Sequence, residues 1–272
     1  MKTMKTILIT GSTDGIGFQT TKRLVSEGHN VLIHGRSLQK VQNVVNELSS
    51  SLNGGTIDSF VADLTDMKDV KKLASEVKQK YQKLDVLINN AGVYKIKDTK
   101  TKDGLDARFV VNTIAPYFLM KELMSIFDNS SRVVNLSSAA QAPVDIKALK
   151  GEYMIPSAGE VYAQSKLALT MWSSSLAPKL KEKGVMIVSV NPKSFLGSKM
   201  VKDAYGVQGA DLSIGADILC RASLGDEFTN AHGKYFDNDI GQFSQPHPDA
   251  LDDEKCKKII DTMEEILSSI AN

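Results

Sequence analysis

Two tyrosine–lysine pairs are the side chains of this sequence best suited to exchange a proton with a substrate. The pairs are Tyr162 with Lys166 and Tyr117 with Lys121. Residues four apart share one face of a helix, so each ammonium can lie near its phenol. A free phenol ionises near pH ~10, and a neighbouring cation lowers its pKa. Either pair could form an acid–base couple, although the same spacing also arises by chance.

A glycine-rich turn near the N-terminus is the second feature with a chemical use. Gly11, Gly15 and Gly17 follow the apolar run at residues 6–10 and lead into a helical pattern. Glycines let the backbone approach a phosphate closely, and the free N–H groups of a helix N-terminus attract it. The turn predicts a dinucleotide site, with a plain tight turn as the alternative.

Short apolar runs alternate with helical patterns along the chain and must position these groups. The apolar runs, which predict strands, are residues 6–10, 30–34, 56–61, 84–89, 132–136 and 185–190. The helical patterns are residues 15–28, 37–51, 66–81, 104–127 and 158–183. This alternation predicts an α/β doubly wound Rossmann fold, with a central parallel sheet of about seven strands and helices on both faces. No linker or repeat interrupts the pattern, so we expect a single domain over residues 1–272.

The composition argues against several classes of protein. The 272 residues are 42% hydrophobic and 24% charged, as in ordinary globular proteins, and the net charge of +1 creates no field that attracts nucleic acid. Two cysteines and four histidines show no metal-ligand spacing. No apolar run approaches the ~18 residues of a membrane span. We expect a cytoplasmic protein without a metal, a nucleic-acid partner or a membrane span.

An ordered set of motifs resembles the short-chain dehydrogenase/reductase family. After the glycine turn come Asn89-Asn90-Ala91-Gly92, Asn112, Ser137-Ser138 and Tyr162-x-x-x-Lys166. The order favours Tyr162 over Tyr117, because the tyrosine follows the serine in that family. The retinol-dehydrogenase-like branch looks most similar, on the runs 102–105, 162–168 and 233–236 and on an insertion at 142–159.

The resemblance implies a catalytic set of Asn112, Ser138, Tyr162 and Lys166. Tyr162 would give a proton to a carbonyl oxygen in reduction, or act as the base in alcohol oxidation. Lys166 would lower the pKa of Tyr162 and bind the cofactor ribose. Ser138, with Ser137 as the alternative, would stabilise developing alkoxide charge. Asn112 would interrupt its helix and hold a water that links Lys166 to solvent, although an asparagine on an ordinary helix is the simpler alternative.

The resemblance also implies which residues contact a nicotinamide dinucleotide. Asp63 would reach the adenine edge, although it could equally cap the next helix. Residues 90–92 would pack against the adenosine side. The complete expected set is Gly11, Ser12, Asp14, Gly15, Ile16, Gly17, Arg36, Asp63, Leu64, Asn90, Ala91, Gly92, Tyr162, Lys166 and Pro192.

The end of the second strand predicts NADP(H) in preference to NAD(H). An acidic side chain there would bind the ribose 2′-hydroxyl and repel a 2′-phosphate. The sequence instead has Gly35, which would leave space, and Arg36, whose fork of donors suits phosphate. Ser37 could add a hydroxyl. Asp14 weighs the other way, because some NADP-dependent members of the family carry a basic residue at that position.

The loop after the sixth strand departs from the family pattern. The family usually has Pro-Gly and then a threonine, whereas this chain has Pro192-Lys193 and Gly197-Ser198. Apolar residues beyond it favour a substrate lid around residues 194–212, or equally a helix packed on the core. A C-terminal helix over residues 252–270 has one apolar face, which would close the core or contact another subunit.

These features predict an oxidoreductase that transfers a hydride between NADP(H) and an apolar carbonyl or alcohol. The alternative is a catalytically silent NAD(P)-binding regulator or scaffold, which the altered Pro192-Lys193 turn favours. By resemblance we also expect a homo-dimer or homo-tetramer. Four apolar residues could supply its seam, or equally face the sheet: Phe118, Leu119, Met171 and Trp172.

Overall fold

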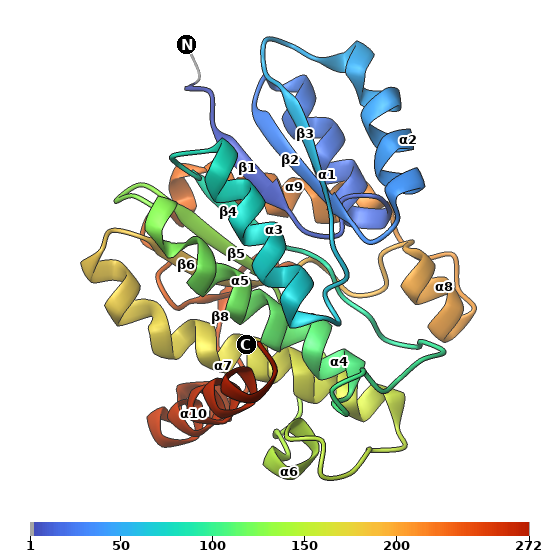
Figure 1. Ribbon diagram of the computed structural model, residues 1–272, viewed down its shortest axis with the longest axis vertical. Helices are drawn as coiled ribbons and strands as arrows, with labels where there is room; N and C mark the ends of the chain where they lie inside the picture. Colours follow the sequence, from blue (N-terminus) through green and yellow to red (C-terminus); the bar gives the residue numbers. More distant parts are fainter. Residues whose placement is uncertain (1–2, 272) are drawn as a thin grey trace.

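A single twisted sheet runs through the centre of the molecule (Figure 1). The computed structural model describes residues 3–271, apart from the side chains of residues 204 and 205. Within this part of the chain the strands are β1 (Thr6–Ile9), β2 (Asn30–Gly35), β3 (Ile57–Val61), β4 (Val86–Asn89), β5 (Arg132–Leu136), β6 (Met186–Asn191), β7 (Tyr235–Asp237) and β8 (Gln242–Ser244). They form one sheet in the order β3-β2-β1-β4-β5-β6-β7-β8.

The pairing of the strands confirms the expected Rossmann-type fold. β1 to β7 are parallel. β2 and β3 add to one side of β1, and from β4 on the strands add to its other side, so the strand order reverses between β1 and β4. The central strands are apolar and buried on both faces, as in the run Val86-Leu87-Ile88. The eighth strand differs from the prediction, because β8 pairs antiparallel with β7 at the edge.

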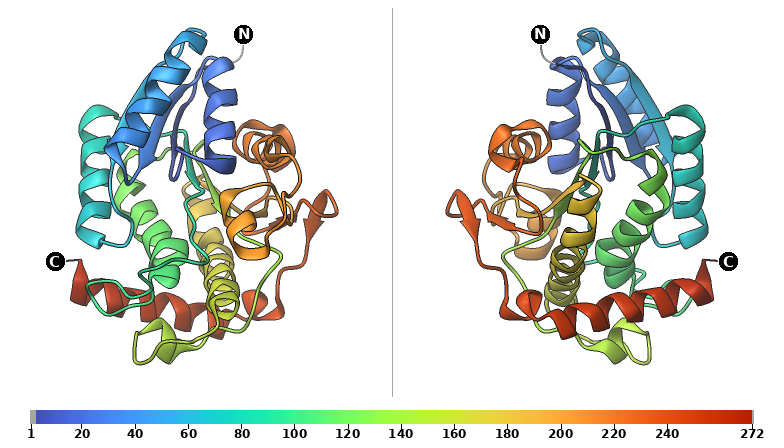
Figure 2. Two further views of the ribbon diagram at one scale, coloured as in Figure 1. Left: turned by 90° about the vertical axis from the view of Figure 1, so that its right-hand side faces the viewer. Right: turned by 90° about the vertical axis from the view of Figure 1, so that its left-hand side faces the viewer.

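Helices cover both faces of the sheet (Figure 2). One face is packed by α1 (Gly15–Ser26), α2 (Leu38–Leu48) and α9 (Leu212–Leu224). The other is packed by α3 (Met67–Lys80), α5 (Ala115–Leu123) and α7 (Ala158–Glu182), and α10 (Asp253–Ile270) packs on α7. Three shorter helices are α4 (Ala107–Phe109), α6 (Ile146–Leu149) and α8 (Lys199–Tyr205). A π-helical turn at Val110–Ile114 joins α4 to α5.

The helix α8 belongs to a loop that is closed at its base. The N–H of Gly197 donates to the Ala210 carbonyl at 2.6 Å, and the N–H of Ala210 donates to the Phe195 carbonyl at 2.8 Å. In Figure 1, α8 stands at the right of the molecule, on the side toward which β1 runs. The region expected to form a lid therefore contains a short helix, and α9, which was not predicted, follows directly.

The C-terminal helix α10 crosses α5 and α7 on the outer side of the molecule (Figure 2). Its apolar face joins the core, and Glu264 on this helix accepts hydrogen bonds from both Tyr117 and Lys121 of α5. Burial, together with the contact to Glu264, raises the pKa of Tyr117. The second tyrosine–lysine pair of the sequence therefore has a structural partner far along the chain.

The four apolar residues considered for a subunit seam are buried within the chain. Phe118, Leu119, Met171 and Trp172 are each at most 7% exposed. They face the sheet and neighbouring helices, which was the alternative interpretation. A homo-oligomer stays a prediction, and its contacts would have to come from other residues.

Over residues 3–271, no helix is long and apolar enough to cross a membrane. The cytoplasmic location stays a prediction. The same part of the chain holds no group of three or more histidine, cysteine or acidic side chains that could bind a metal ion.

Replacement of Met263 by alanine tests whether α10 belongs to the core. The Met263 side chain is 0% exposed, so Met263→Ala should lower the free energy of unfolding by about 2–5 kcal/mol through lost contacts and a cavity. Lys257→Ala, at an exposed position of the same helix, is the control and should change it by less than about 0.5 kcal/mol. Urea unfolding followed by circular dichroism measures both. An effect at Met263 as small as the control would show that α10 is only loosely attached.

Candidate active site

The carboxyl ends of four neighbouring strands bring the predicted motifs to one edge of the sheet. The glycine turn follows β1, residues 90–92 follow β4, Ser137 and Ser138 follow β5, and Pro192 follows β6. Ligands of open parallel sheets bind at this edge, beside the point where the strand order reverses. The first turns of α7 lie against the same edge, because the Lys166 ammonium donates to the Leu136 carbonyl at 2.6 Å.

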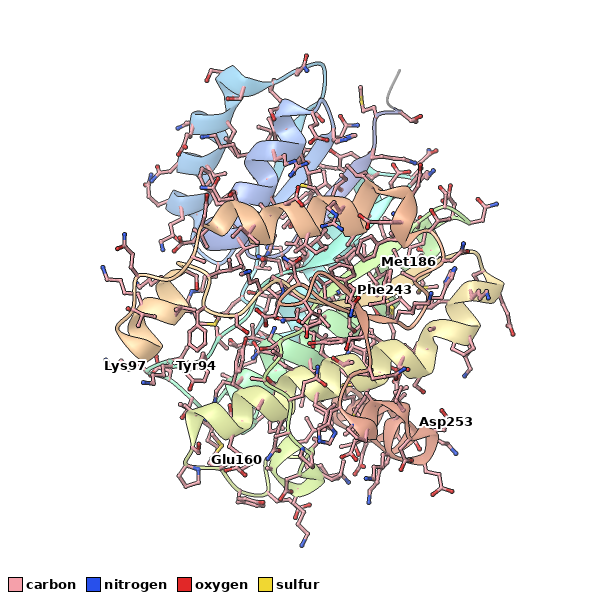
Figure 3. The ribbon with its side chains drawn as sticks, turned by 180° about the vertical axis from the view of Figure 1, so that it is seen from behind. Tyr94, Lys97, Glu160, Met186, Phe243 and Asp253 are labelled. Atoms are coloured by element: carbon pink, nitrogen blue, oxygen red, sulfur yellow. The ribbon has the colours of Figure 1, made fainter. Side chains whose placement is uncertain are left out.

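Tyr162 and Lys166 lie one helical turn apart near the start of α7. The Lys166 Nζ atom is 5.7 Å from the centre of the Tyr162 ring. The ring of Tyr94 meets the Tyr162 ring edge-on, with centroids 5.0 Å apart and planes at 87°. Figure 3 shows Tyr94 between α8 and the start of α7, where Glu160 is labelled. No motif pointed to Tyr94, which only the folded chain brings to Tyr162.

Lys166 is a buried cation, with 4% of its surface exposed. Burial lowers the pKa of Lys166 from 10.5 to about 8, because the charged form loses its hydration. The side chain is still protonated at neutral pH. A poorly solvated ammonium therefore lies beside Tyr162, and such a charge favours the phenolate form of a tyrosine.

Ser137 and Ser138 have different surroundings. Ser137 is 3% exposed, and its hydroxyl shares a 2.7 Å hydrogen bond with Thr170 of α7. Ser138 is half-buried, and its Oγ accepts from the Ala140 N–H at 3.1 Å. The Ser138 backbone is held in turn by the Tyr235 hydroxyl at 3.0 Å. Of the two serines, Ser138 has the hydroxyl that a substrate could reach.

Asn112 lies in the π-helical turn, at the interruption of the helix that the resemblance implied. Its side chain is 1% exposed and makes three contacts: its Oδ1 accepts from the Val93 N–H at 2.8 Å, and its Nδ2 donates to the Val93 carbonyl and the Ser165 hydroxyl, each at 2.9 Å. Asn112 therefore ties the segment after β4 to α7, one residue before Lys166.

The glycine turn is held against the end of β4. Gly11 has φ 66°, which favours glycine, and a Cβ on Gly17 would lie 2.3 Å from the Gly11 carbonyl oxygen. The Asn90 amide donates to the carbonyls of Thr10 and Gly11 at 2.9 and 3.0 Å, while the Thr10 hydroxyl accepts from the Asn90 N–H. The side chain of Asn90 is thus used within the turn, and the Thr10 hydroxyl supports it.

Three polar residues around the turn have distinct partners. Ser12 is fully buried, its hydroxyl lies within hydrogen-bond distance of the Ile9 and His34 carbonyls, and its N–H donates to the His34 carbonyl at 3.0 Å, so neither donor is left for a cofactor. The Nδ1 atom of His34 accepts from the Gly11 N–H at 3.2 Å, and burial lowers the pKa of His34 to about 4, which keeps it neutral. Asp14 caps α1 by accepting from the Gly15 N–H at 2.7 Å. Its carboxylate therefore lies at the N-terminus of α1, the helix end that begins with Gly15 and Ile16 and is expected to bind phosphate.

The end of β2 differs in one respect from the expectation. The space beside Gly35 is filled, because a Cβ there would lie 2.7 Å from the Thr13 methyl group. An acidic side chain at this position would collide with Thr13. Arg36 is exposed at the end of the strand, and Ser37 caps α2 through the Lys40 N–H at 3.5 Å.

Asp63 is not the cap of α3, because that role belongs to Asp66, which accepts from the Lys68 N–H at 3.0 Å. The Oδ1 atom of Asp63 accepts from the N–H and hydroxyl of Thr65, and the adjacent Leu64 is buried.

The small residues after β4 leave room near the reacting groups. A Cβ on Gly92 would lie 3.5 Å from both the Lys166 Nζ atom and the Asn112 Oδ1 atom. Together with the close contact of Gly17 and Gly11, this arrangement fits a bound nicotinamide dinucleotide, with its pyrophosphate at the N-terminus of α1.

Comparison with known proteins agrees with this arrangement. The short chain dehydrogenase family model matches residues 5–206. Human retinol dehydrogenase 13 is 26% identical over 278 residues, covering 94% of this chain and 82% of that protein. Mouse retinol dehydrogenase 12 is 30% identical over 245 residues, covering 85% of this chain and 77% of that protein. A short chain dehydrogenase from Burkholderia cenocepacia, solved in complex with NADP, is 26% identical with a TM-score of 0.69, covering 87% of this chain and 97% of that one.

The chain belongs to the short-chain dehydrogenase/reductase family and is an NAD(P)-dependent oxidoreductase that acts on a small molecule. Within the family it is retinol-dehydrogenase-like, as its motifs indicated.

Replacement of Lys166 by methionine tests the burial of its charge. Between pH 8 and pH 10.5 the unfolded wild type binds more protons at this site than the folded form, so its free energy of unfolding rises with pH. Relative to Lys166→Met, the wild type should gain on the order of 3 kcal/mol across this window. Urea unfolding at a series of pH values measures the difference. Lys22→Met, which removes an exposed lysine, should follow the wild type, and the same behaviour in Lys166→Met would contradict the burial.

Proposed function

We propose that this protein transfers a hydride between NADP(H) and an apolar carbonyl or alcohol, with Tyr162 as the acid and base. The observation that carries the proposal is the buried ammonium of Lys166, 5.7 Å from the centre of the Tyr162 ring. Two relatives are named for retinol, an apolar alcohol, which supports an apolar substrate here.

The chemistry divides between the cofactor and the protein. The nicotinamide supplies or accepts the hydride when it is bound. Tyr162 gives its proton to the substrate oxygen as that oxygen gains negative charge, and takes a proton from the hydroxyl in the reverse direction. Ser138 donates a hydrogen bond to the same oxygen. Lys166 stabilises the phenolate that Tyr162 forms.

Asn112 has a positioning part in this scheme. Its contacts with Val93 and Ser165 hold α7 against the segment after β4. The π turn around it opens the regular helix, and we propose that a water bound there links Lys166 to solvent, which would return the proton to Tyr162 after each turnover.

The residues at the end of β2 support the proposed preference for NADP(H) over NAD(H). The acidic side chain that NAD(H)-dependent enzymes use there is absent. If position 35 carried one, it would collide with the Thr13 side chain. Arg36 is exposed at the same place and offers planar donors to a 2′-phosphate. Asp14 opposes the choice, but it lies at the N-terminus of α1, where its carboxylate already accepts the Gly15 N–H.

The acid–base role is tested by Tyr162→Phe, with Tyr117→Phe as its matched control. Removal of the Tyr162 hydroxyl should lower kcat by about 10²–10⁴-fold and leave the dissociation constant of NADP(H) unchanged. Tyr117→Phe removes a hydroxyl that donates to Glu264 of α10, so its kcat should equal that of the wild type. Oxidation of NADPH with a panel of apolar aldehydes, ketones and quinones provides the assay and identifies the substrate. Full turnover by Tyr162→Phe would rule out the mechanism.

The cofactor preference is tested by Arg36→Ala. Loss of charge-assisted contacts to the 2′-phosphate should weaken NADP(H) binding by about 10–100-fold and change NAD(H) binding much less. Lys22→Ala, which removes one exposed positive charge from α1, is the control. Calorimetric titration of the wild type and the two variants with both cofactors measures the six dissociation constants. Equal losses for the two cofactors would mean that Arg36 only stacks on adenine, and tighter NAD(H) binding by the wild type would overturn the preference.

A further inference from the structure

The loop after β6 holds unusual backbone conformations. Lys193 has φ 112° and Phe195 has φ 53°, and they are the two residues other than glycine with positive φ in the described part of the chain. Such conformations are unfavourable for residues with a Cβ and persist only where surrounding contacts enforce them. We call residues 193–198 the strap.

A carboxylate from a distant turn is bonded to the middle of the strap. Asp239, in the turn between β7 and β8, accepts from the Ser194 N–H through Oδ1 at 2.9 Å and from the Ser194 hydroxyl through Oδ2 at 2.6 Å. Ser194 lies between Lys193 and Phe195, so Asp239 holds the residue between the two strained positions. The Asn191 amide donates to the same Oδ2 atom at 2.9 Å, which ties the end of β6 to this carboxylate.

The far end of the strap lies on the glycine turn. A Cβ on Gly15 would be 3.8 Å from the Ser198 Cβ atom. A Cβ on Gly215 of α9 would be 2.7 Å from a methyl group of Leu196 and 3.1 Å from one of Ile16. The strap therefore extends from the end of β6, beside the reacting groups, to the turn expected to hold the pyrophosphate.

Several charges surround Asp239. Burial raises the pKa of this carboxyl, but the hydrogen bonds from Ser194 and Asn191 and the charge of Lys193 lower it by more, so the group is ionised at neutral pH. The neighbouring carboxylate Asp237 accepts from the Asn191 amide at 2.8 Å and from the Asp239 N–H at 3.0 Å, and both of these partners lie outside the strap.

We propose that Asp239 is a positioning residue that holds the strap closed over the dinucleotide and thereby sets how tightly the cofactor binds. The inference rests on the proposed function, since it assumes that NADP(H) lies along the edge that the strap spans. Asp239 does not itself reach the turn of Gly15. Its effect is transmitted through Ser194, which it holds between the two residues of positive φ.

The test compares Asp239→Asn with Asp237→Asn. An amide has the size of the carboxylate but lacks its charge, and it cannot accept both Ser194 bonds as strongly. The dissociation constant of NADP(H), measured by calorimetry, should rise at least about tenfold in Asp239→Asn, and kcat at saturating cofactor should fall much less. Hydrogen exchange at the amides of residues 193–198 should accelerate in the same variant. Asp237→Asn should leave both quantities as in the wild type.

A second substitution separates the strap from general damage to the β7–β8 turn. Glycine adopts φ 112° without strain, so adding Lys193→Gly to Asp239→Asn should bring the dissociation constant back toward the wild-type value. Lost stability of the turn would not be repaired at Lys193.

The possible outcomes are distinct. Unchanged NADP(H) binding and strap exchange in Asp239→Asn would overturn the proposal, as would equal effects in Asp237→Asn. Absence of any dinucleotide binding by the wild type would also refute it. Full turnover by Tyr162→Phe would refute the acid–base assignment alone. The proposal for Asp239 compares the NADP(H) dissociation constants of Asp239→Asn and the wild type, and that comparison does not depend on Tyr162.

Discussion

The buried ammonium of Lys166 is the constraint on which the active-site half of the molecule depends. A charge that has lost its hydration needs polar partners in fixed positions, and the Leu136 carbonyl at the end of β5 provides one. Other side chains bind α7 to the same strand and the residue after it: the Ser137 hydroxyl shares a bond with Thr170, and the Asn135 amide donates to Ser173 at 2.7 Å. A shift of α7 by one turn would leave all these buried groups unsatisfied. The register of the helix, and with it the place of Tyr162, is therefore set by hydrogen bonds as much as by apolar packing.

The π-helical turn fixes the position of a second, adjacent face of α7. Asn112 donates to Ser165, and the Trp172 indole donates to the Thr113 hydroxyl at 3.1 Å, both within buried surroundings. These two bonds are nearly two helical turns apart on α7, so they fix both its position and its rotation about its axis. Asn112, Tyr162 and Lys166 thus lie on helical segments that are hydrogen-bonded to one another. Rigid support of this kind suits proton transfer, which is sensitive to small displacements.

Features that depend on local periodicity or on ordered motifs could be predicted from the sequence. The apolar runs located the first six strands. The order of the motifs favoured Tyr162 over Tyr117 as the acid and base, and that choice stays a prediction. Features that depend on distant contacts could not be predicted, because no local pattern encodes them: Glu264 lies 147 residues from Tyr117, and Thr13 fills the space beside Gly35 only in the folded chain. The strands β7 and β8 have three residues each, too few to show an alternation. Tyr94 contacts Tyr162 and Asp239 contacts Ser194 only in the folded chain, and neither has a residue type or spacing that distinguishes it from many others in the sequence.

The π turn at Val110–Ile114 also limits how this part of the protein can evolve. A π turn contains one residue more than an α-helical turn of similar length, as if a single residue had been inserted into a regular helix. Deletion of one residue would restore a continuous helix but would rotate α5 by about 100° relative to α4. Phe118 would then leave the core, and Asn112 would lose Ser165. The number of residues in this segment is therefore constrained, and a change of length would need a second change to compensate for it.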